Sequence, residues 1–248
     1  MRRIFIIASL LLFVQIAPAF CSDSSSLFLT ATKAYEDGEY EKSAENYELL
    51  LNHVKNGNLY YNLANSYFKQ GKIGYALLNY SRAKKYDPAD GDINDNIGYV
   101  KTLTKDKIED KRSFSFIYKI FFYYDFFNNS VFFYILTAFN ILFFVALIVR
   151  FYTKRSYVDF IKNAILCLLI IFSIGYVLNY KVYCYDEKGV VVSSEISVKS
   201  GTSMNDTVLF NLHEGSEFKV IKSQGDWYKI ELLDKKKGWV SNKNVELI

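Results

Sequence analysis

The sequence YYNLANSYFKQGKIGYALLNYSRAKKYDP, residues 60–88, predicts a pair of packed helices. Its apolar and small residues recur every three or four positions, which is the spacing of one helix face. Gly71 permits a turn between the two helices, Ala64 and Ala76 are small enough for them to approach closely, and Pro88 ends the pair. The two stripes are Tyr60, Leu63, Ala64 and Tyr67 before the glycine, and Ala76, Tyr80 and Ala83 after it.

This pattern resembles the tetratricopeptide repeat (TPR), whose period is about 34 residues. A weaker copy precedes it, in which Ser43 replaces the usual alanine, and a third helix starting near Ile93 extends the stack. We therefore predict an all-α TPR helical-repeat domain over 22–112. Stacked helical pairs leave a concave surface that binds peptides or helices. Our candidates for this groove are Tyr61, Asn62, Asn65, Phe68 and Lys69. The alternative, to which we give equal weight, is that these residues are solvated or flank the core.

The N-terminus has the three parts of a secretory signal: a positive start, an apolar run and small residues before a cleavage position. We predict a signal peptide over 1–21. Cleavage after Ala19 or Cys21 satisfies the small-residue rule, an uncleaved anchor is the alternative, and Phe20 argues against lipidation of Cys21.

Two apolar runs predict transmembrane helices over 130–150 and 163–181. The basic loop between them, 151–162, belongs on the cytoplasmic side, which places both flanking modules on the periplasmic side of a bacterial inner membrane. The aromatic segment 113–129 predicts an interfacial helix, or a docking helix for another membrane protein. A buried soluble helix is the alternative for either apolar run.

Residues 182–248 contain short alternating runs separated by glycine and aspartate, which predict antiparallel hairpins. The order VKSGTS, VLFNLHEGSEFKVI, GDWYKIEL and KGWVS resembles a bacterial SH3-like domain. That resemblance implies an all-β barrel that binds peptidoglycan or protein. Trp227 and Trp239 are candidate ligand platforms, with core filling as the alternative.

The composition of the chain argues against several classes of function. Lys and Arg number 30 against 26 Asp and Glu, so the net charge of +4 is too small to indicate nucleic-acid binding. Three Cys and two His leave little material for a metal site, and Cys167 and Cys184 have no obvious disulfide partner. No nucleophile elbow or phosphate-binding glycine loop is present in the sequence. We expect no enzymatic activity, no cofactor and no metal.

The order of parts is that of a multidomain membrane protein: signal peptide, TPR domain, two transmembrane helices and SH3-like barrel. It resembles the BatE-like proteins of the Bacteroides aerotolerance (Bat) family, chiefly through residues 60–80 and 209–239. The resemblance implies a non-enzymatic scaffold beside membrane-bound Bat proteins with von Willebrand A-type domains. The alternative is a cell-wall sensor that binds peptidoglycan through the barrel. Proteins, peptidoglycan and membrane lipid are the expected partners.

Overall fold

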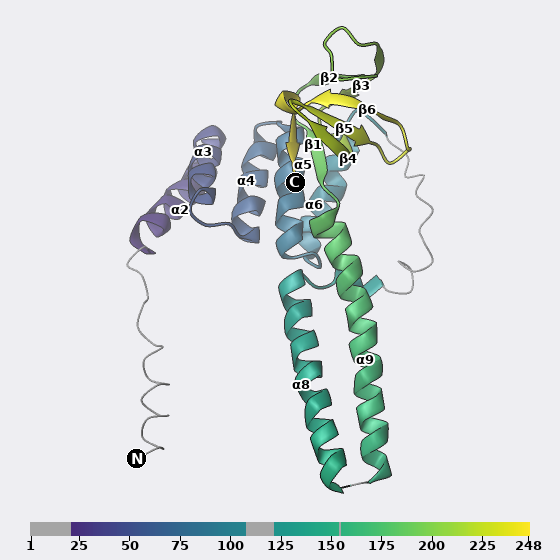
Figure 1. The fold of residues 1–248 in the computed structure, drawn as a ribbon. Coiled ribbons are helices and arrows are strands. Elements are labelled where there is room, and N and C mark those ends of the chain that lie inside the picture. Colours follow the sequence, from purple (N-terminus) through teal and green to yellow (C-terminus); the bar gives the residue numbers. More distant parts are fainter. Residues whose placement is uncertain (1–20, 108–121, 154) are drawn as a thin grey trace, which may run out of the picture.

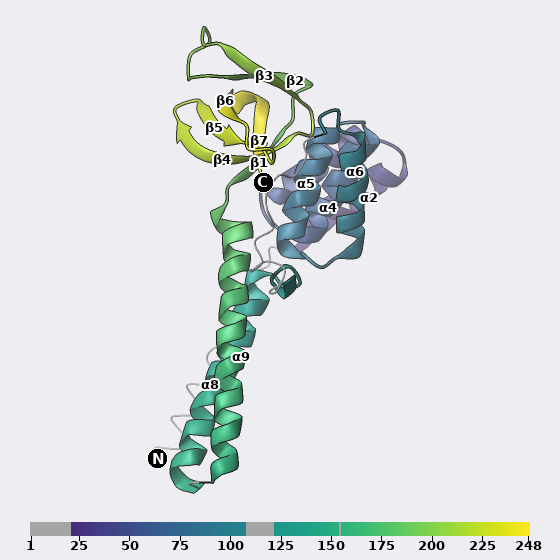
Figure 2. The same ribbon diagram turned by 90° about the vertical axis from the view of Figure 1, so that its right-hand side faces the viewer.

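The computed structural model describes residues 21–107, 122–153 and 155–248 (Figure 1). These residues form a domain of short helices, two long helices that run side by side, and a curved antiparallel sheet. The short helices and the sheet lie next to each other at one end of the long helices (Figure 2). Below, the helical domain is residues 21–107 and the sheet domain is residues 188–248.

The helical domain is a row of helices in which each packs against its neighbour in the chain. Ala64 and Ala76 are fully buried between the central pair, where their small side chains allow close approach. Gly71 joins this pair with a φ of +76°, a left-handed conformation that favours glycine. The buried hydroxyl of Ser43 lies 3.0 Å from that of Ser66, so both are satisfied. The helices are α2 (Cys21–Glu36), α3 (Tyr40–Leu51), α4 (Gly57–Lys69), α5 (Ile73–Tyr86) and α6 (Gly91–Leu103).

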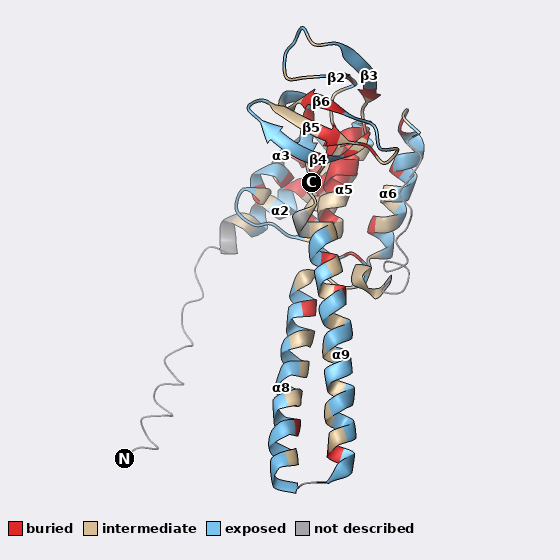
Figure 3. Cartoon of the chain, turned by 45° about the vertical axis from the view of Figure 1, so that its right-hand side comes forward, coloured by how far each residue is buried: buried red, intermediate tan, exposed pale blue. Residues whose placement is uncertain are grey.

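Helices α8 (Asn129–Thr153) and α9 (Ser156–Tyr180) have 25 residues each and are long and apolar enough to cross a membrane. Most of their surface is exposed, as the pale blue in Figure 3 shows. The loop expected over 151–162 is instead almost wholly helical. The polar residues of this segment can lie on the surface of a helix. The guanidinium of Arg150 on α8 forms an ion pair with Asp159 on α9 at 2.7 Å, so both charges are satisfied within the helices.

Two sequence predictions fall largely outside the described residues. The signal peptide expected over 1–21 reaches them only at Cys21, where α2 begins. Of the interfacial helix expected over 113–129, the structure describes only the end, a 3-10 turn η2 (Phe122–Asp125) followed by the start of α8. The ring of Tyr123 in this turn packs on α9 at Gly175, where a Cβ atom would lie 2.4 Å from it.

The sheet domain is one seven-stranded antiparallel sheet with the strand order β3-β2-β6-β5-β4-β1-β7. Its inner face encloses an apolar core that includes Val198, Ile230 and Val240, all fully buried. Burial alternates along β2 and β6, as expected for strands with one face on a core. The strands are β1 (Lys188–Val191), β2 (Glu195–Lys199), β3 (Val208–His213), β4 (Glu217–Gln224), β5 (Trp227–Glu231), β6 (Lys237–Ser241) and β7 (Val245–Leu247).

The two domains share part of one core. Val190 of β1 is fully buried in the same apolar cluster as Ala76 and Leu77 of α5. At the start of α5, a Cβ on Gly74 would lie 2.5 Å from the carbonyl oxygen of Val191, so this approach requires glycine. The helical domain and the sheet domain are therefore packed into one unit, which we call the head.

Candidate functional site

The first candidate site is a cavity of about 130 Å³ on the helical domain. Helices α2, α3 and α4 line it with one phenylalanine ring, two tyrosine phenols, one threonine hydroxyl and two carboxamides. We call it the helical cavity. Its lining residues are Phe28, Thr32, Tyr35, Tyr47, Asn62 and Asn65.

The helical cavity is polar but uncharged. The Thr32 hydroxyl lies 2.9 Å from the phenol of Tyr47, and the buried phenol of Tyr80 donates a hydrogen bond to Oδ1 of Asn65. Burial raises the pKa of Tyr47 and of Tyr35, so both phenols are neutral near pH 7. The lining can therefore recognise a ligand through hydrogen bonds and ring contacts rather than through charge.

The structure divides the five groove residues expected from the sequence. Asn62 and Asn65 line the helical cavity. Tyr61 faces the following helices instead: its ring centroid lies 5.7 Å from that of Tyr80, and its phenol accepts a hydrogen bond from Asn96. Phe68 packs with Tyr99 at 5.9 Å between ring centroids, and Lys69 is exposed in the last turn of α4. The structure thus brings two of the five to one cavity, and their role in binding stays a prediction.

The second candidate site is the outer face of the sheet. Trp227 and Trp239 both point away from the apolar core, because Tyr228 and Val240, the next residues on their strands, pack on it. Neither tryptophan is part of the core, so the core-filling alternative does not describe them. Both rings are half-buried, and their role as ligand platforms stays a prediction.

Lysines surround the two tryptophans on this face. Trp239 stands directly opposite Lys229 on one neighbouring strand and opposite Lys199 on the other. The ammonium of Lys229 lies 5.9 Å from the Trp239 ring centroid, within the range of a cation–π contact. Lys222 pairs with Lys229 in the next strand. We call these five residues the Trp/Lys face; its aromatic surfaces beside ammonium groups suit a ligand with apolar or sugar surfaces and carboxylates.

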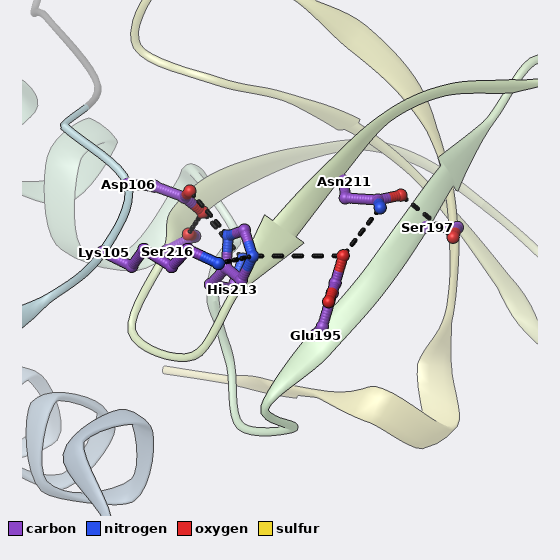
Figure 4. Close-up of polar contacts among 7 residues, drawn as sticks. All are labelled: Lys105, Asp106, Glu195, Ser197, Asn211, His213 and Ser216. Carbon is purple, nitrogen blue, oxygen red and sulfur yellow. Dashed lines mark hydrogen bonds and ion pairs between the residues drawn. The ribbon is translucent and has the colours of Figure 1, made fainter.

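A third polar cluster joins the two domains (Figure 4). Asp106, just after α6, accepts hydrogen bonds from the backbone N–H of His213 at 2.7 Å, from Nδ1 of His213 at 2.9 Å and from the hydroxyl of Ser216. Lys105 lies 2.7 Å from the other ring nitrogen, Nε2. Because an ammonium group only donates, Nε2 is the acceptor and Nδ1 carries the proton given to Asp106.

Burial acts to raise the pKa of Asp106, but the hydrogen bonds from Ser216 and His213 outweigh it and hold that pKa below the ordinary 3.8. Serine, histidine and aspartate also form hydrolytic triads, but there the hydroxyl is bonded to the imidazole. Here the hydroxyl and the imidazole are both bonded to the carboxylate, and Ser216 is only 3% exposed. This geometry holds two domains together and does not activate a nucleophile.

Two further contacts strengthen this junction. The Glu214 carboxylate accepts from the backbone N–H of Gly74 at 2.8 Å, so the sheet domain caps the N-terminus of α5. Lys101 forms an ion pair with Glu217 at 2.5 Å. His213 and Glu214, at the end of β3, therefore both contact the helical domain. The only signal in the sequence was a group of polar residues beside a glycine. It did not indicate which distant residues they contact.

Among the described residues, no group of three or more His, Cys, Asp or Glu side chains is placed to hold a metal ion. Cys167 is a free, exposed cysteine on α9.

Comparison with known proteins gives one result for the sheet domain. Residues 194–246 match a family described as bacterial SH3 domain. No match to a TPR or Bat family was seen, and no curated protein matches the chain. The match covers β2 to β6 and most of β7, and it leaves out β1, the strand that packs on α5. The C-terminal sheet is therefore similar to bacterial SH3 domains, which points to a binding module.

Proposed function

We propose that this protein is a non-enzymatic scaffold, anchored in a membrane, that holds a protein segment in the helical cavity and a second ligand on the Trp/Lys face. The observation that carries the proposal is the shared core of the head. Because Val190 and α5 pack in one apolar cluster, the two surfaces are held at a fixed separation. Ligands brought to one such head gain effective concentration for each other without any new contact between them.

The membrane anchor is supported by the exposed apolar surface of α8 and α9. Exposing apolar surface to water costs a free energy of about 25 cal/mol per Å². Lipid chains would cover this surface and remove that cost. Helix α8 leaves the head and α9 returns to it (Figure 2), which supports the proposal that both domains lie on one side of the bilayer. Arg150 and Arg155 lie at the far end, which favours a periplasmic head under the positive-inside rule.

For the helical cavity we propose a membrane-bound protein partner of the Bat type, with a von Willebrand A-type domain. The order of the parts along the chain supports this choice, and the neutral lining fits an uncharged peptide segment. Since part of the helical core comes from the sheet domain, deleting the helical domain would disrupt the head, and point variants are the better probe.

The test is co-purification of full-length protein with a co-expressed von Willebrand A-type Bat protein from detergent-solubilised membranes. Asn62→Ala removes a carboxamide from the cavity, and the matched control Asn58→Ala changes an exposed asparagine on the same helix. Losing one hydrogen bond of about 1 kcal/mol predicts roughly fivefold weaker recovery with Asn62→Ala only. Equal recovery of both variants, or no recovery by the unaltered protein, removes the support for this partner.

The Trp/Lys face favours a second candidate function, a cell-wall sensor. Peptidoglycan combines sugar rings with carboxylates, which suit tryptophan rings beside lysines. We expect full-length protein in detergent to sediment with purified peptidoglycan, and Trp239→Ala to reduce the bound fraction. The control is Leu29→Ala, which changes an exposed apolar residue of α2 in the helical domain. Sedimentation that does not respond to Trp239→Ala would assign binding to another surface.

A further inference from the structure

A second cavity lies where the head meets the long helices. It has a volume of about 430 Å³ and opens between α4, α5 and the last residues of the sheet domain. We call it the basal pocket. Three cationic side chains line it, Lys55, Arg82 and Lys85, together with two tyrosines and the residues 247–248.

Two of the three cations are fixed by backbone carbonyls. Arg82 donates to the carbonyl of Leu247 at 2.5 Å, and Lys85 donates to that of Ile248 at 2.9 Å. Arg82 also pairs with a carboxylate, because Glu246 lies 3.4 Å from its guanidinium. Within the described part of the chain, no carboxylate lies within ion-pair distance of Lys55. The described lining of the pocket thus gathers three cationic side chains and no acidic one, and Arg82 and Lys85 are held in place.

The aromatic wall is a stacked pair. The rings of Tyr60 and Tyr86 lie 5.9 Å apart between centroids with an interplanar angle of 29°. Tyr86 is 41% exposed, so one ring remains accessible at the mouth of the pocket. Tyrosine is enriched at the interface between a membrane and water, because its ring is apolar and its hydroxyl is polar.

Both walls of the pocket lie beside the ends of the long helices. The carbonyl of Tyr86 accepts a hydrogen bond at 2.8 Å from Asn128, the residue before α8. On the other wall, the backbone N–H of Ile248 donates to the carbonyl of Lys188 at 2.9 Å. Lys188 begins β1, a few residues after the end of α9. If α8 and α9 span a bilayer, the pocket lies at the level of the lipid headgroups.

We propose that the basal pocket binds the phosphate group of an anionic phospholipid from the outer surface of that bilayer. Arginine and lysine donate charge-assisted hydrogen bonds to phosphate oxygens, and the tyrosine pair contacts the glycerol and the first carbons of the chains. The volume admits one headgroup. This inference rests on the membrane anchoring proposed above, but not on either ligand of the head.

The test uses full-length protein in nanodiscs of phosphatidylcholine alone or with a quarter of phosphatidylglycerol. Native mass spectrometry after release from the discs counts the lipids retained. Lys55→Gln/Lys85→Gln removes two charges from the pocket, and Lys33→Gln/Lys243→Gln removes two exposed charges from elsewhere on the head. Each lysine near an anionic surface contributes roughly fivefold, so we expect phosphatidylglycerol retention to fall about 25-fold in the pocket variant only.

Several results separate the possibilities. Equal retention by the two double variants overturns the inference. Displacement of phosphatidylglycerol by millimolar inorganic phosphate also overturns it, because the pocket would then hold the free ion. Lys55→Glu alone checks folding, since no hydrogen bond of that side chain is present among the described residues; it should weaken retention while circular dichroism stays unchanged. Release of the unaltered protein from membranes by alkaline carbonate would refute the anchoring itself, whereas carbonate-resistant protein without lipid selectivity refutes only the pocket.

Discussion

Replacing Asp106 with alanine should loosen the contact between the two domains without unfolding either. The carboxylate accepts three hydrogen bonds from the sheet domain. Ser216 is 3% exposed, so its hydroxyl cannot turn to water, and an unsatisfied buried donor costs about 1–3 kcal/mol. The His213 side chain is 19% exposed and water can reach it, so its loss costs less. We expect the junction to be weakened by about 2–4 kcal/mol in total.

The assay is native-state hydrogen exchange of the Gly74 amide, which donates across the junction to the Glu214 carboxylate at 2.8 Å and is not bonded to Asp106. Local opening of the junction exposes this amide to exchange. A loss of about 2–4 kcal/mol corresponds to roughly 30- to 900-fold faster exchange. The matched control is Asp95→Ala, which removes an exposed carboxylate from α6. Exchange in Asp106→Ala within twofold of the control would refute the role given to this carboxylate.

Three further predictions concern packing and pH. Gly74→Ala should lower the unfolding temperature because its Cβ would collide with the sheet domain, at a cost of about 1–3 kcal/mol, whereas Gly98→Ala, with open space around it, should not. Gly175→Ala should displace the Tyr123 ring, which limited proteolysis would detect as faster cleavage before α8; unchanged cleavage would contradict that packing. The lowered pKa of Asp106 stabilises the fold above the unfolded pKa and loses that effect as pH falls through the folded value below 3.8. The unfolding temperature of the unaltered protein should therefore fall more steeply below about pH 4 than that of Asp106→Asn.

The parts that local patterns encode could be predicted from the sequence. The spacing of Ala64 and Ala76 around Gly71 predicted a close helical pair, and the structure has one. Two apolar runs gave two long helices, although α9 begins at Ser156 because the charged residues before residue 163 are compatible with a helix surface. Alternation in the C-terminal region predicted strands, and the SH3 match agrees.

The contacts that join the parts could not be predicted in this way. Asp106 and His213 are separated by 107 positions, and no periodic pattern in the sequence indicates that they are in contact. The faces of β5 and β6 were also undetermined, because alternation shows that one face is buried without showing which. Tyr61 illustrates the same limit: its position on α4 suggested a groove, but α5 and α6 cover it.

The shared core of the head also sets an order for biosynthesis. The helical domain is made first, yet Val190, Val192 and Ile248 complete its apolar cluster, and the ribosome adds them only after both long helices. The helical domain therefore stays incompletely packed until these residues of the sheet domain have been made. During that interval its apolar surface is open to aggregation or to a chaperone. A chain released early by the ribosome would lack not only its sheet but also part of the interior of its helices.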